Sequence, residues 1–196
     1  MRNRAKYLIP IALVAAVAAM AVWAFSSSDE GTIVGAGNPE SRAVDYDAAL
    51  ADAPAPLAEL YAQGDELLPG GQPAFERQIE ALAGYPVVVN VWASWCGPCR
   101  YEFPFFQSQA AKRGTEVAFL GVDSDDAEEA AETFLQDLPL PYPSFSDPDR
   151  EIFRSVEASN FPSTAFFDRE GELVYTRIGG YPDEATLAAD IKRYAG

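Results

Sequence analysis

The residues of this chain best suited to chemistry are its two cysteines, Cys96 and Cys99, which are separated by two residues. The segment Val87–Val91 in front of them is rich in β-branched residues and is typical of a buried parallel strand. Behind them, Arg100–Lys112 contains no glycine and is typical of a helix. A helix N-terminus presents unpaired N–H groups and a positive partial charge, which stabilise a thiolate. The pattern therefore predicts Cys96 as a redox nucleophile and Cys99 as the resolving thiol.

Two other roles compete with a redox role for this cysteine pair. A Cys-x-x-Cys pair can supply half of a zinc site, but four ligands are needed and the chain has no histidine and no third cysteine. A purely structural disulfide stays open as an alternative, although closing so short a loop removes little entropy from the unfolded chain. We therefore expect a redox-active pair that needs no metal and no other cofactor.

The sequence around the cysteines resembles a known family. Residues 89–100 read Val-Asn-Val-Trp-Ala-Ser-Trp-Cys-Gly-Pro-Cys-Arg, which is similar to the active-site strand and turn of the thioredoxin superfamily. The similarity is greatest to the membrane-anchored TlpA/ResA-like branch and covers roughly residues 73–196. It implies an α/β thioredoxin-like fold, in which a central mixed β-sheet is flanked by helices, behind an N-terminal transmembrane helix.

The resemblance also implies a substrate-binding surface around the cysteines. Pro162 matches a proline that is cis in this family and faces the cysteines, where it exposes the preceding backbone to a substrate strand. The alternative is a proline that merely begins an edge strand. Phe161 departs from the smaller residues usual before that proline, which bears on the shape of the substrate. The residues expected to bind substrate are Trp95, Gly97, Pro98, Phe161 and Pro162.

Glu102 is a further candidate catalytic residue beside Cys96 and Cys99. It is the third residue after Cys99, and the pattern Cys-x-x-Glu-x-Pro over Cys99–Pro104 matches the TlpA/ResA-like branch. A carboxylate this early in a helix can simply stabilise the helix end. Near a thiol it can instead exchange protons as the disulfide forms or breaks. Asn90 stands where thioredoxins carry a buried aspartate, and since asparagine cannot act as a base, Glu102 is the nearest candidate proton acceptor.

The N-terminal 25 residues are predicted to anchor the chain in a membrane. Basic residues at positions 2, 4 and 6 precede Leu8–Phe25, a segment without any charge. At about 1.5 Å per residue this segment is close to the ~30 Å thickness of a bilayer core. The basic flank places the N-terminus in the cytoplasm and the rest of the chain outside. Small residues near Ala21 and Ala24 also fit signal-peptide cleavage, but we expect an uncleaved anchor.

Three regions follow the anchor. Residues 26–42 are polar and glycine-containing and are predicted to be a flexible linker. Residues 43–72 are rich in alanine and are predicted to form a helical extension, and residues 73–196 the thioredoxin-like domain. The domain's expected helices are Pro73–Ala83, Arg100–Lys112, Asp126–Leu138, Pro148–Val156 and Pro182–Tyr194, and its expected strands are Val87–Val91, Glu116–Asp123, Ser163–Phe167 and Glu172–Ile178, with Leu138–Pro143 as an extended connector.

The charge of the chain limits its partners. After residue 28 there are thirty acidic and eleven basic residues, a net charge of −19. Such an acidic surface argues against nucleic acid and anionic lipid as partners. A location outside the cytoplasm permits disulfide chemistry that cytosolic reductants oppose. We expect a single-pass protein of the cell membrane with a monomeric extracytoplasmic domain.

Together these features predict a thiol:disulfide oxidoreductase. Gly97 and Pro98 between the cysteines resemble the residues of reducing thioredoxins, so reduction of client-protein disulfides is favoured. The resemblance suggests clients outside the membrane, apocytochromes c among them, and a membrane electron donor of the thiol-relay type. The alternatives are an oxidant that donates its disulfide to folding proteins, and a non-catalytic interaction domain with a structural disulfide.

Overall fold

The structure, a computed structural model, describes residues 45–196. The expected anchor Leu8–Phe25 and the linker at 26–42 lie outside these residues. Within the described part, no helix is both long and apolar enough to cross a bilayer. The elements are α2 (Tyr46–Leu50), α3 (Ala55–Tyr61), β1 (Leu67–Leu68), α4 (Gly71–Ala81), β2 (Val87–Trp92), α5 (Gly97–Arg113), β3 (Ala118–Ser124), α6 (Glu128–Asp137), β4 (Ser144–Asp147), α7 (Glu151–Ser155), β5 (Ser163–Phe167), β6 (Leu173–Ile178) and α8 (Glu184–Tyr194).

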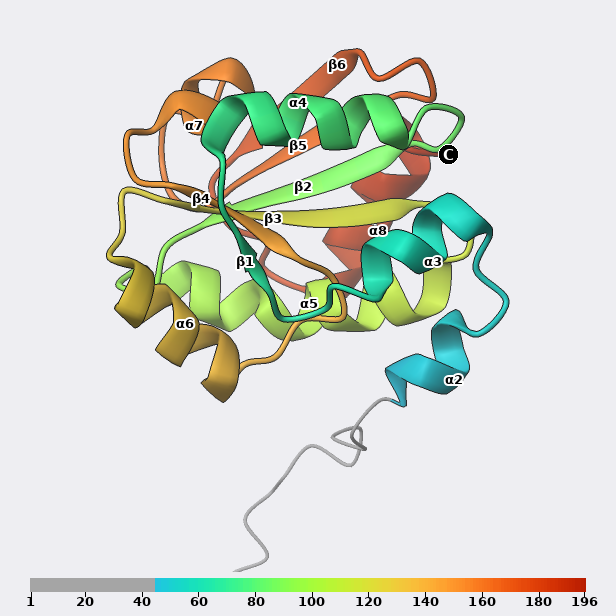
Figure 1. The fold of residues 1–196 in the computed structure, drawn as a ribbon, viewed down its shortest axis with the longest axis horizontal. Helices are drawn as coiled ribbons and strands as arrows, with labels where there is room; N and C mark the ends of the chain where they lie inside the picture. Colours follow the sequence, from blue (N-terminus) through green and yellow to red (C-terminus); the bar gives the residue numbers. More distant parts are fainter. Residues whose placement is uncertain (1–44) are drawn as a thin grey trace, which may run out of the picture. The chain divides into compact units, whose positions relative to one another are not determined.

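A mixed sheet with the strand order β1-β4-β3-β2-β5-β6 runs through residues 45–196 (Figure 1). The first four of these strands are mutually parallel, and β5 runs antiparallel to both β2 and β6. The inner strands β2 and β3 are buried along their whole length. Helices cover both of their faces, which explains why their sequences are mostly apolar rather than alternating.

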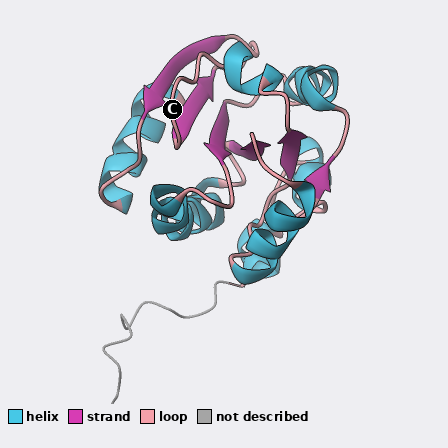
Figure 2. Ribbon diagram, turned by 90° about the vertical axis from the view of Figure 1, so that its left-hand side faces the viewer, coloured by secondary structure: helices cyan, strands magenta, loops and turns pink. Residues whose placement is uncertain are grey.

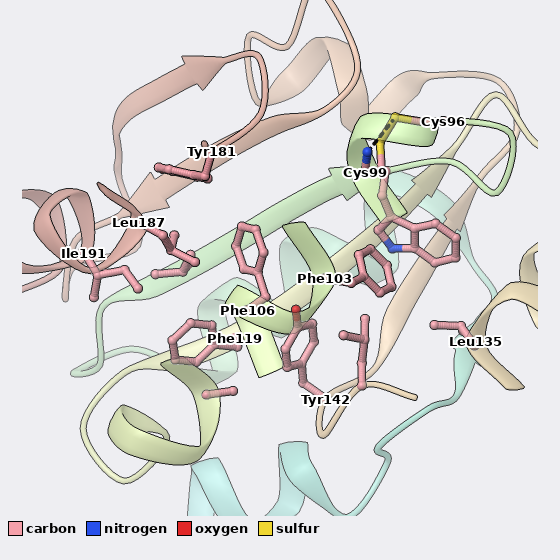
Figure 3. Close-up of a cluster of buried hydrophobic side chains, with 14 of the residues drawn as sticks. Cys96, Cys99, Phe103, Phe106, Phe119, Leu135, Tyr142, Tyr181, Leu187 and Ile191 are labelled. Carbon is pink, nitrogen blue, oxygen red and sulfur yellow. Dashed lines mark hydrogen bonds between the residues drawn. A yellow bond between two sulfur atoms is a disulfide. The ribbon is translucent and has the colours of Figure 1, made fainter. Parts of the chain in front are cut away.

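Helices pack on both faces of the sheet (Figure 2). The buried side chains of α3, α4 and α7 form one hydrophobic layer against the sheet. Those of α5, α6 and α8 form the other layer, and Cys96 and Cys99 belong to it. In Figure 3 the two cysteines lie at one edge of this second cluster, with Phe103 and Phe106 following along α5. The disulfide is therefore built onto the hydrophobic core rather than onto a loose loop.

The expected mixed sheet with flanking helices is confirmed. The predicted strands appear as β2, β3, β5 and β6, and each predicted helix of the domain is present with shifted ends. The 43–72 extension, predicted to be helical, contains the helices α2 and α3, but it is not purely helical, because Leu67–Leu68 forms an edge strand paired with β4. Both β1 and β4 escaped prediction, since they are two and four residues long and form through pairing between distant segments.

The helix predicted from Asp126 to Leu138 differs in its start and in its buried face. It begins at Glu128, because the Asp126 side chain bonds to main-chain N–H groups outside the helix. The spacing of apolar residues along this helix predicts that Ala130, Phe134 and Leu138 point inward. Phe134 is buried, which confirms its position, but Ala130 and Leu138 are only partly buried, and Ala131 and Leu135 are buried instead.

Candidate functional site

The cysteines lie where β2 leads into α5. Cys96 is the N-cap of α5, and its Sγ accepts the main-chain N–H of Cys99 at 3.1 Å. Pro98 suits the first turn of the helix. Main-chain N–H groups there have no intrahelical partner, so the lack of one in proline costs nothing, and the fixed φ of proline is already helical. The two cysteines form a disulfide, with their Cα atoms 5.3 Å apart.

This geometry distinguishes the two sulfur atoms. Cys99 is fully buried, whereas Cys96 retains 4% exposure and is followed by the exposed residues Gly97 and Pro98. After reduction, the Cys96 sulfur would keep an N–H donor and the positive end of α5 beside it, and both favour a thiolate. The arrangement can therefore support attack by Cys96 and resolution by Cys99.

Aromatic side chains border the disulfide. Trp95 is 59% exposed, and its indole Nε1 donates to the main-chain oxygen of Asp125 at 3.0 Å. Its ring meets that of Phe161 edge to face, with centroids 5.1 Å apart. Phe161 also packs against Phe153, at 5.0 Å between centroids. The large residue at 161 thus fills a space between two other rings and joins Trp95 in one exposed apolar surface.

Pro162 and Glu102 approach each other from different elements. The Phe161–Pro162 peptide bond is cis, as the family resemblance implies. A Cβ atom placed on Gly180 would lie 3.3 Å from Pro162 Cγ and 3.4 Å from Glu102 Oε2. Gly180 therefore allows the segment before α8 to pass close to both side chains.

Glu102 is fully buried and bonds to two other parts of the fold. Its Oε1 accepts from Asn90 Nδ2 at 2.8 Å, and its Oε2 accepts from the main-chain N–H of Tyr181 at 3.0 Å. Neither bond involves the N-terminus of α5, so the side chain does not act as a cap there. Burial raises the pKa of Glu102 to about 7. The hydrogen bonds from Tyr181 and Asn90 and the charge of Arg177 each lower this pKa, but burial has the larger effect.

A carboxyl group that titrates near neutral pH can both accept and return a proton. Glu102 lies one helical turn after Cys99 on α5, on a neighbouring part of the same helix face. Cys96, Cys99 and Glu102 therefore follow one another within the first two turns of α5, and Asn90 donates a hydrogen bond to the Glu102 carboxylate. A role for Glu102 in thiol proton transfer stays a prediction.

Sequence reasoning missed the partners of this site that come from distant loops. Tyr181 acts through its main-chain N–H, which no side-chain pattern reveals. The pair Gly179-Gly180 was the available signal, since glycines often mark a close approach of backbone to other groups. Asp125 and Asp126 at the end of β3 were also missed, although Asp126 accepts a hydrogen bond from the Ser94 N–H next to the active-site turn.

Comparison with known proteins places the chain in a family. The Redoxin family matches residues 68–191, and the chain belongs to it. Thiol-disulfide oxidoreductase ResA of Bacillus subtilis is 28% identical over 103 residues, which cover 52% of this chain and 58% of that protein. Thiol:disulfide interchange protein DsbE of Pseudomonas aeruginosa is 34% identical over 114 residues, covering 57% and 62%. The expected relationship to ResA-like proteins is thereby confirmed.

The solved structures agree with this relationship. The structure of a thiol:disulfide interchange protein DsbE from Chlorobium tepidum has a TM-score of 0.56 and 28% identity, and the match covers 60% of this chain and 85% of that one. The thioredoxin-like α/β fold is thus established. The matched region spans about three fifths of the length of the curated ResA relatives.

The buried carboxyl of Glu102 gives a prediction about stability. A carboxyl whose pKa is raised by folding stabilises the fold fully below its unfolded pKa, and this contribution is lost as pH rises through the folded pKa. With the pKa raised from 4.5 to about 7, the wild-type free energy of unfolding should fall across that interval. Glu102→Gln removes this dependence. The free energy of unfolding of the variant minus that of wild type should therefore rise by on the order of 3 kcal/mol as the pH increases from 4.5 to about 7.

Urea unfolding at several pH values measures this difference. The exposed Glu132, changed to Gln, is the matched control and should show no comparable trend. The same Glu102→Gln variant should show lower thiol pKa values, because a negative charge near the cysteines has been removed. A pH-independent stability difference would mean that Glu102 does not titrate as described.

Proposed function

We propose that this protein is a thiol:disulfide oxidoreductase that reduces disulfides of client proteins. The observation that carries the proposal is the asymmetry of the pair: Cys96 Sγ accepts the Cys99 N–H at the start of α5, while Cys99 is fully buried. The two relatives described above are named as a thiol-disulfide oxidoreductase and a thiol:disulfide interchange protein, which supports the same class of reaction.

The proposed reaction proceeds in two exchanges. The Cys96 thiolate attacks one sulfur of a client disulfide, the client S–S bond breaks, and the released client sulfur takes up a proton. Cys99 then loses its proton and attacks Cys96 Sγ, which frees the second client thiol and leaves the Cys96–Cys99 disulfide. Two electrons have passed to the client. We propose that Glu102 takes the proton from Cys99 in the second exchange.

Gly97 and Pro98 between the cysteines support the reducing direction, since they resemble the corresponding residues of reducing thioredoxins. In that direction a thiol-relay donor at the membrane would restore the reduced pair, and no further cofactor is proposed. The clients would be disulfide-containing proteins outside the membrane, with apocytochromes c as one class. An oxidant would run the same exchanges in reverse.

The proposed location follows from the segment ahead of the domain. Leu8–Phe25 is long and apolar enough to span a bilayer, and basic residues precede it. We propose that it holds the protein in the cell membrane, with residues 43–196 on the outer side.

Single-cysteine variants test the order of attack. Cys99→Ser should accumulate a mixed disulfide with a disulfide-bonded substrate such as insulin, because the bond formed by Cys96 is no longer resolved. Cys96→Ser should accumulate little, because the remaining thiol is fully buried. Non-reducing electrophoresis followed by mass spectrometry of the linked peptides measures both. Equal trapping by the two variants would show that the assigned order is wrong.

Fractionation of cells that express the full chain tests the location. The protein should stay with the membranes after carbonate or high-salt washing, because an apolar anchor resists both treatments. N-terminal sequencing should find the chain uncleaved. A soluble product that begins near residue 22 or 25 would instead establish a signal peptide.

A further inference from the structure

Two consecutive residues after β3 hold the segment that leads to Cys96. The carboxylate of Asp126 accepts the main-chain N–H of Ser94, and the carbonyl of Asp125 accepts the indole N–H of Trp95 at 3.0 Å. Ser94 and Trp95 are the two residues directly before the nucleophile. The two residues after β3 therefore bind both residues of this segment.

Asp126 is not used as an ordinary helix cap. The N-cap of α6 is Ala127, and that helix has no side-chain cap. The second carboxylate oxygen of Asp126 accepts only the N–H of its immediate neighbour, Ala127, at 2.8 Å. The hydrogen bond that links the Asp126 side chain to a segment distant in the sequence is the one from the Ser94 N–H.

A second buried carboxyl group stands beside Asp126. Asp123 is 2% exposed and lies at the end of β3, opposite Trp92 in the sheet. Its Oδ1 has no hydrogen-bond partner among the described residues. Burial and the charges of Asp126 and Asp147 raise the pKa of Asp123 to about 8.

The other charged groups at this corner have partners of their own. Asp147 of β4 accepts from Ser124 Oγ and from the N–H groups of Ile152 and Phe153. Arg150, ahead of α7, pairs with the exposed Asp125 side chain at 3.7 Å. Glu128 and Glu129 in the first turn of α6 are exposed.

We propose that Asp126 is a positioning residue that fixes Ser94 and thereby sets the place of Cys96 at the start of α5. This inference rests on the proposed function only in taking Cys96 as the attacking thiol.

Variants of Asp126 in the full chain test the positioning role. In the reduced protein, Asp126→Ala should slow alkylation of Cys96 at neutral pH by about fivefold, as expected from the loss of one hydrogen bond. Asp126→Asn keeps an acceptor for Ser94 and should restore most of the rate. Asp125→Asn is the matched control, because it removes a charge one residue away while the contact with Trp95 is made by the main chain. Equal rates in all three variants would overturn the proposal.

The same labelling separates this proposal from the proposed order of attack. If alkylation of the reduced protein labels Cys99 rather than Cys96, the proposed order of attack fails, whatever the effect of Asp126→Ala.

Discussion

The structure depends on the way the first turns of α5 are joined to the sheet. Cys96 caps the helix, Cys99 is buried one turn later, and Glu102, a turn further, bonds to Asn90 of β2 and to the Tyr181 main chain. Each of these contacts places a reactive or titratable group at the helix start. Because α5 also buries Phe103 and Phe106 in the core, the position of the disulfide is set by the packing of the whole helical layer.

Two carboxyl groups are kept in an environment that disfavours their charge. Glu102 and Asp123 both have raised pKa values, and burial is the largest cause in each case. Burying an ionisable group costs stability unless hydrogen bonds compensate. Here the bonds from Asn90 and Tyr181 compensate in part for Glu102.

Much of this could be predicted because the information is local. The strand, the Cys-x-x-Cys turn and the helix behind it occupy one continuous stretch, so the sequence was sufficient to identify β2, α5 and the two cysteines. The short strands β1 and β4 exist only through pairing with distant segments. The donors to Glu102 and the link from Ser94 to Asp126 likewise join residues from 12 to 79 positions apart, which no local pattern reveals.

The central claim is that the Cys96–Cys99 pair is a reducing redox couple rather than a structural bond. Its reduction potential tests this claim most directly, measured on the full chain by equilibration with dithiothreitol buffers and labelling of free thiols. The resemblance of Gly97 and Pro98 to the residues between the cysteines of reducing thioredoxins predicts a thioredoxin-like value of about −270 mV. A value well below about −300 mV would identify a structural disulfide, and a value near roughly −120 mV an oxidant; either result would contradict the account.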